Sequence, residues 1–140
     1  MSPAFSPDGR YVAYVSDETG ELEVYVRSYP DSERKWAISS SGGREPVWSR
    51  DGNSLFYRNG GEMWEVPIQT EPEFRAGVAT LLFDQPYAPR SGPTATVPDY
   101  DVSADGQSFL MLRHSGDSGL TEVRVILNWA EELERLAPSN

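Results

Sequence analysis

Three copies of a short motif, Ser-x-Asp-Gly, constrain the fold of this 140-residue chain more than any other feature of its sequence. The copies occupy residues 6–9, 49–52 and 103–106, and a strand-like run follows each of them. An Asp-Gly pair in a connection this short strongly indicates a β-hairpin, because Asp accepts hydrogen bonds from nearby amides and Gly adopts a positive φ without steric cost. A calcium loop is the alternative, but each turn offers one carboxylate where calcium needs several oxygen donors. We therefore expect structural turns, with the Ser side chains bonding to the local backbone.

The spacing of these turns indicates a repeated four-stranded unit. The Asp residues of the motif, Asp8, Asp51 and Asp105, are 43 and then 54 residues apart. Further strand-like runs follow the hairpins at residues 22–29, 62–68 and 122–127, and outer runs follow at residues 35–39 and 79–83. A period of about 40 to 50 residues with four strands per unit is typical of a β-propeller. The sequence therefore predicts an all-β fold, a partial β-propeller of about three four-stranded blades.

The chain divides into blades, one long loop and a terminal helix within a single domain. A segment rich in Pro, Gly and Thr without periodicity predicts a loop inserted before the third blade. Near the C-terminus, Asn128 can cap a helix of about two turns that Pro138 ends. The predicted boundaries are about 1–43, 44–84 and 99–128 for the blades, 85–98 for the loop and 129–136 for the helix.

Several strand-like runs are apolar at successive positions, as in residues 11–15 and 109–112. Such a strand is covered on both faces, whereas a sheet with one wet face alternates apolar and polar residues. We interpret most of the aromatic residues as packing between blades. They are Phe5, Tyr14, Trp48, Phe56, Tyr57 and Trp64.

Composition excludes some classes of partner and chemistry. The chain has 12 basic and 22 acidic residues and a net charge of −10, so it should repel nucleic acid backbones and anionic lipid surfaces. It has no cysteine, which removes disulfides and thiolate chemistry but does not reveal the compartment. No apolar run has the roughly 18 residues of a membrane-spanning helix. The start has no signal-peptide pattern and leads directly into a repeat, which suggests a piece cut from a longer protein.

The run from Phe5 to Tyr14, "FSPDGRYVAY", resembles the WD40-like repeat called PD40 of TolB-type β-propellers. The linking pattern "SSGGREPVWSRDG" resembles it as well. The order from "YDVSADGQSFLML" to "VILNWAEELERL" is similar to the C-terminal propeller segment of bacterial serine/threonine kinases and transcriptional regulators. The resemblance implies a soluble or extracytoplasmic bacterial domain of a larger protein, and a propeller that binds or senses rather than one specific activity.

Three blades are too few to close a ring, because the TolB-type propellers that the sequence resembles usually have six or more. An open arc leaves two apolar flanks uncovered, each large enough to be an association surface. Two copies related by a twofold axis would close a six-bladed ring, so we expect a homodimer. Edge-to-edge pairing of strands in another arrangement is the alternative.

A ligand, either a protein or a small molecule, is expected on the face opposite the Ser-x-Asp-Gly turns, where loops converge on the channel mouth. The candidate ligand-binding residues there are Arg44, Glu45, Arg58, Arg90, Tyr100 and His114. The function that we expect is therefore a non-catalytic binding or sensing module without a cofactor.

The alternative function is a low-specificity hydrolase that acts on ester or phosphoester bonds at the channel mouth. His114 is the only histidine, and with Asp99 or Asp101 it could hold a divalent metal that generates hydroxide. A triad of His114 with Ser115 and Asp117 is disfavoured, because these residues share one turn and no rigid scaffold holds the nucleophile. One histidine per chain makes a weak metal site, so no metal ligands are assigned.

Overall fold

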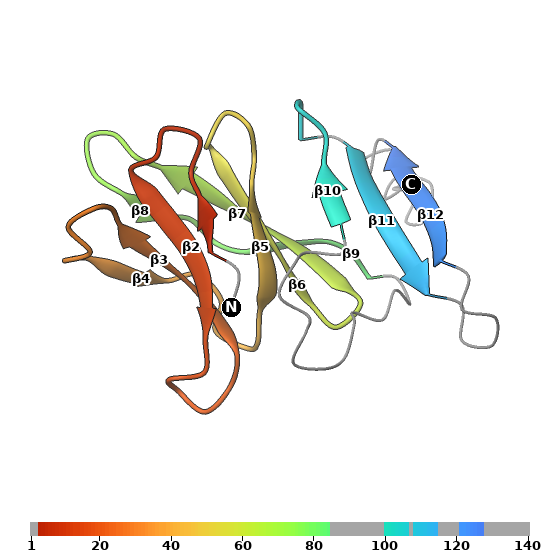
Figure 1. The fold of residues 1–140 in the computed structure, drawn as a ribbon, viewed down its shortest axis with the longest axis horizontal. Coiled ribbons are helices and arrows are strands. Elements are labelled where there is room, and N and C mark those ends of the chain that lie inside the picture. Colours follow the sequence, from red (N-terminus) through yellow and green to blue (C-terminus); the bar gives the residue numbers. More distant parts are fainter. Residues whose placement is uncertain (1–2, 85–99, 107, 115–120, 128–140) are drawn as a thin grey trace, which may run out of the picture.

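The computed structural model describes residues 3–84, 100–106, 108–114 and 121–127, and in this part of the chain the regular elements are all β-strands. The predicted helix at 129–136 and loop at 85–98, together with Arg90 and Asp99, lie outside the described residues. The strands form three antiparallel sheets that follow one another along the chain and lie side by side in Figure 1.

The first sheet has the strand order β1-β2-β3-β4. Its strands are β1 (Ala4–Phe5), β2 (Tyr11–Ser16), β3 (Glu23–Ser28) and β4 (Lys35–Ala37). The third sheet has the order β10-β11-β12. Its strands are β10 (Tyr100–Val102), β11 (Ser108–His114) and β12 (Thr121–Leu127). Both of these sheets are meanders, in which every strand pairs with the strand before it.

The second sheet has the order β5-β6-β7-β8, and a further strand, β9, also pairs with β7. Its strands are β5 (Arg44–Trp48), β6 (Ser54–Asn59), β7 (Glu62–Gln69), β8 (Arg75–Ala76) and β9 (Thr80–Asp84). β8 pairs with the end of β7 and β9 with its beginning. The outer strand predicted at residues 79–83 is therefore present, but it is preceded by a short extra strand that the sequence did not indicate.

The Ser-x-Asp-Gly motif forms the same turn three times. In the second copy the Ser49 hydroxyl donates to the Asp51 carboxylate at 2.6 Å and accepts from the Ser54 amide at 3.0 Å. The Gly52 amide donates to the Ser49 carbonyl at 3.0 Å, and Gly52 has φ +75°. The other two copies make equivalent contacts. The prediction that these motifs are structural turns is confirmed.

Successive side chains of β6 point to opposite faces of the second sheet. Four successive side chains of this strand are buried, so both faces of the sheet are covered there. Leu55 and Tyr57 pack toward the first sheet, in a core that includes Ala13, Val24 and Val26. Phe56 packs toward the third sheet, where its ring meets that of Phe109 edge to face with centroids 5.3 Å apart. Buried aromatic and aliphatic side chains thus join each sheet to the next.

Replacing Ser49 by Ala should weaken the fold, because the hydroxyl serves both a carboxylate and a backbone amide. We expect the free energy of unfolding at pH 7 to fall by about 1 to 2 kcal/mol in urea denaturation followed by tryptophan fluorescence. Ser41→Ala is the matched control, since Ser41 is exposed, and it should change stability by less than about 0.5 kcal/mol. Equal stability of the two variants would contradict the role of the hydroxyl.

Acid should reduce the difference in unfolding free energy between the wild type and Ser49→Ala. The Ser49 hydroxyl is the largest cause that lowers the pKa of Asp51 from its ordinary 3.8. A carboxylate with a lowered pKa in the folded chain stabilises the fold above its ordinary pKa, and this stabilisation is lost as pH falls through the lowered value. We therefore expect the stability difference between the two proteins to shrink below about pH 4, when denaturation is repeated across the acid range. A difference that does not depend on pH would contradict this.

Candidate functional site

Three of the predicted ligand-binding residues meet in the interior, between the second and third sheets. The Arg58 guanidinium on β6 forms an ion pair with the Glu45 carboxylate on β5, with Nη1 and Oε2 3.4 Å apart. The Tyr100 hydroxyl on β10 donates to the Glu45 backbone carbonyl at 2.6 Å. The side chains of Arg58 and Glu45 are only 2% and 9% exposed, so the cluster is closed to solvent.

A local irregularity of β5 presents Glu45 to its two partners. The pairing of β5 with β6 shifts register between Arg44 and Val47, and Glu45 has φ +55°, a left-handed conformation that few non-glycine residues adopt. A β-bulge of this kind bends the strand and redirects a side chain. The ion pair with Arg58 and the hydrogen bond from Tyr100 hold Glu45 in this conformation.

Tyr100 acts in this cluster as a neutral hydrogen-bond donor. Its burial, followed by the nearby charge of Glu45, raises the pKa of the hydroxyl well above its ordinary value. The proton therefore stays on the hydroxyl in the ordinary pH range, and the bond to the Glu45 carbonyl persists. The cluster fastens the first strand of the third sheet to the first strand of the second.

The other predicted site residues are dispersed. Arg44 is exposed on β5, and Asp101 is exposed on β10, where its carboxylate accepts from the Val102 amide at 2.8 Å. His114 is the last residue of β11 and pairs with Thr121, so it belongs to the strand end rather than to the turn that the sequence predicted. Within the described ranges, no group of three or more His, Cys, Asp or Glu side chains could hold a metal ion.

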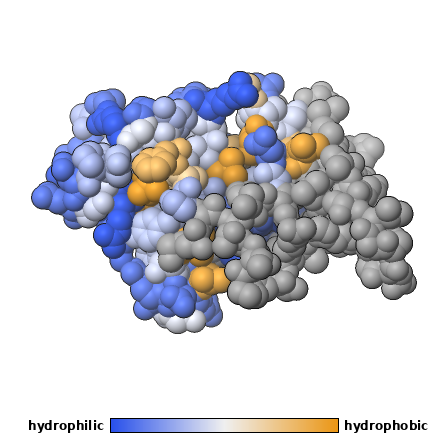
Figure 2. Space-filling model, viewed as in Figure 1, coloured by the Kyte–Doolittle hydropathy of each residue, from blue (hydrophilic) through white to orange (hydrophobic). Residues whose placement is uncertain are grey.

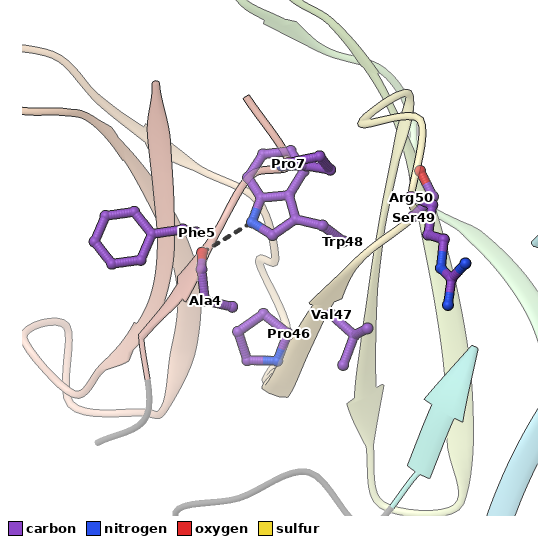
Figure 3. A pocket seen from close by; sticks show the side chains of 8 residues that line it. All are labelled: Ala4, Phe5, Pro7, Pro46, Val47, Trp48, Ser49 and Arg50. Atoms are coloured by element: carbon purple, nitrogen blue, oxygen red, sulfur yellow. Dashed lines mark hydrogen bonds between the residues drawn. The ribbon is translucent and has the colours of Figure 1, made fainter. Parts of the chain in front are cut away.

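An open hollow of about 340 Å³ lies elsewhere, between the first strands of the first and second sheets. Figure 3 shows its lining: Ala4, Phe5, Pro7, Pro46, Val47, Trp48, Ser49 and Arg50. The Trp48 indole N–H donates to the Ala4 carbonyl at 2.9 Å and ties β5 to β1 beneath the hollow. Exposed Arg50 supplies a positive charge to a lining that is otherwise mainly apolar. We call this hollow the β1–β5 groove.

The β1–β5 groove lies at the Ser-x-Asp-Gly end of the strands, whereas the sequence predicts a ligand at the opposite end. Pro7 and Arg50 occupy the second position of the first two motif copies. Pro7 also lies directly beside Gly52, so the two turns are neighbours. The one available signal was that this second position varies between copies while Ser, Asp and Gly do not, which leaves it free for contacts outside the turn.

The comparisons with known proteins agree with the repeated sheets. No protein-family model matches the chain. The Tol-Pal system protein TolB of Alcanivorax borkumensis is 44% identical over 57 residues, which are 39% of this chain and 13% of that protein. The aligned segment is thus a small fraction of the length of this relative.

Solved structures support the same architecture. Oligogalacturonate lyase from Vibrio parahaemolyticus matches with a TM-score of 0.56 and 14% identity, over 79% of this chain and 27% of the lyase. The tricorn protease matches with a TM-score of 0.50 and 13% identity, over 84% of this chain and 11% of the protease. At these identities the likeness shows the fold alone. The fold is therefore that of a β-propeller segment whose sheets are propeller blades, and part of the sequence is similar to TolB. In the described residues, no helix is long and apolar enough to cross a membrane.

Removing the arginine of the buried ion pair should destabilise the chain strongly. In Arg58→Met the Glu45 carboxylate loses its charged partner while it remains largely buried, so we expect unfolding to become easier by about 3 to 5 kcal/mol. The double variant Glu45→Gln/Arg58→Met should recover part of this loss, because it removes the buried charge as well. Denaturation of both variants, with exposed Arg44→Met as the control, measures the effect. A loss as large in Arg44→Met would show that the burial of the pair does not matter.

Proposed function

We propose that this chain is a non-catalytic β-propeller module that binds a partner in the β1–β5 groove. The groove itself is the observation that carries the proposal. Its volume of about 340 Å³ lies within the range of ligand sites, and residues from two adjacent blades form its walls. The groove is also largely preformed, because the Trp48 to Ala4 hydrogen bond holds β5 to β1 and Pro7 lies beside Gly52 of the second turn.

The lining favours an apolar group that carries a carboxylate. Pro7, Pro46 and Val47 offer apolar contacts, and Arg50 at the edge offers a guanidinium suited to a carboxylate. A peptide segment with an apolar side chain beside an acidic residue or a C-terminal carboxylate meets both requirements. The buried cluster of Glu45, Arg58 and Tyr100 then acts indirectly, because it fixes the start of β5 and hence the groove wall.

Binding is testable with 3-phenylpropionate as the probe, an aromatic ring with one carboxylate. In ¹H–¹⁵N NMR titrations we expect shifts of the amides of Val47, Trp48 and Arg50, and weaker effects from 3-phenylpropylamine, which carries the opposite charge. Arg50→Glu should remove the preference for the carboxylate, while Arg44→Glu on the same strand should keep it. The absence of shifts in the groove, or shifts confined to another surface, would overturn the proposal.

The hydrolase alternative predicts turnover where the binding module predicts none. We expect p-nitrophenyl acetate and bis(p-nitrophenyl) phosphate to be hydrolysed at the background rate, with or without added Zn²⁺, Mg²⁺ or Mn²⁺. His114→Ala should leave that rate unchanged. A protein-dependent rate that His114→Ala abolishes without loss of β-sheet circular dichroism would establish the alternative in place of the binding module.

A further inference from the structure

The residues on the outer face of the first blade align with a buried packing surface of the second blade, but no described blade covers them. The repeats align Phe5, Val12 and Tyr14 with residues 48, 55 and 57 of the second blade. In the second blade these positions hold Trp48, Leu55 and Tyr57, which are 9%, 0% and 5% exposed because the first blade covers them. Phe5, by contrast, is 53% exposed, and Figure 3 shows its ring pointing away from Trp48.

The third blade also has a face that no described blade covers, on the side where a following blade would pack. Leu110 occupies the position of Phe56 in the second blade and of Ala13 in the first, both at most 1% exposed under the following blade. Leu110 itself is 41% exposed. Asp101 pairs with Leu110 in the sheet and is exposed on the same face.

The outer face of the first blade is not bare hydrocarbon, which differs from the apolar flank that the sequence predicted. Tyr14 and Tyr25 stack with ring centroids 5.9 Å apart, and the Arg27 guanidinium and the Lys35 ammonium lie over these rings. On the face drawn in Figure 2, hydrophobic surface is split into separate patches rather than one continuous band. The cations keep the tyrosine-lined face in water. Lys35 is also paired with Glu18, so the positive charge of this face comes mainly from Arg27.

We infer that a second copy of this chain covers both faces, with the first blade of each copy packed on the third blade of the other. Three observations point to this occupant. The two faces repeat the two sides of interfaces already present in the chain. Arg27 on one face is opposite in charge to Asp101 on the other. Three blades from each of two copies make six, within the four to eight blades of closed propellers.

The repeat also predicts which residues meet across the dimer. Within the chain, Phe56 of the second blade contacts Phe109 of the third. The equivalents of this pair at the closing interface are Leu110 and Val12 of the other copy. The contact is head to tail, so it occurs twice in a closed dimer and brings neither residue near its own counterpart.

Cross-linking tests this geometry directly, because the chain has no native cysteine. Packed sheets are about 10 Å apart, so a bis-maleimide of similar length can join Cys side chains introduced at the two positions. We expect covalent dimers from the double variant Val12→Cys/Leu110→Cys and from a mixture of the two single variants. Neither single variant alone should cross-link. A covalent dimer from Val12→Cys alone would overturn the head-to-tail arrangement.

Light scattering with size-exclusion chromatography tests the stoichiometry. The wild-type chain should have twice the 15.6 kDa mass of one copy at micromolar concentration. Leu110→Asp should weaken the dimer by about tenfold or more with unchanged circular dichroism, since it places a charge in the interface. Val78→Asp is the matched control, because Val78 is 85% exposed in the outer part of the second blade, and it should stay dimeric. A wild-type monomer, or an open series of larger species, would overturn the closed ring.

Discussion

Burial of both faces of one sheet is the constraint on which the rest of this structure depends. In β6 successive side chains alternate between two hydrophobic cores, with Leu55 and Tyr57 on one side and Phe56 on the other. Such a sheet is stable only between two neighbours, because either face alone would expose large apolar side chains to water. The first and third blades supply those neighbours, and each is left with an outer face of its own.

Two kinds of polar contact secure this stack. The Ser-x-Asp-Gly turns are local, since the residues that bond to one another lie within five positions in the sequence. The cluster of Glu45, Arg58 and Tyr100 joins residues as much as 55 positions apart and ties the third blade to the second. The local contacts define each hairpin, and the long-range contacts define how the hairpins pack. The β1–β5 groove depends on both, because its walls are two turns and two strands from adjacent blades.

The candidate site was predictable only in part. The sequence predicts Glu45, Arg58 and Tyr100 as site residues because they are polar and near strand ends. The fold does bring them together, although in the interior instead of at an open mouth. Their position relative to solvent depends on the bulge at Glu45, which no sequence motif indicates. The groove was not predicted, because its two walls come from segments some 40 residues apart whose contact requires the blades to be stacked.

Two-sided burial, which the sequence predicts from residues 11–15 and 109–112, is found in the described residues along β6 of the second sheet and not along β2 of the first or β11 of the third. The sequence by itself determined the hairpin turns and most strand positions. These follow from interactions between near neighbours: a glycine at positive φ, a Ser and Asp that bond to adjacent amides, and apolar runs in strands. Tertiary structure alone decided which exposed residues share a surface. Arg50 joins Pro7 there, and Phe5 is left uncovered on an outer blade face. Such surfaces arise from the packing angle between sheets, which the sum of many side-chain contacts sets and no single stretch of sequence encodes.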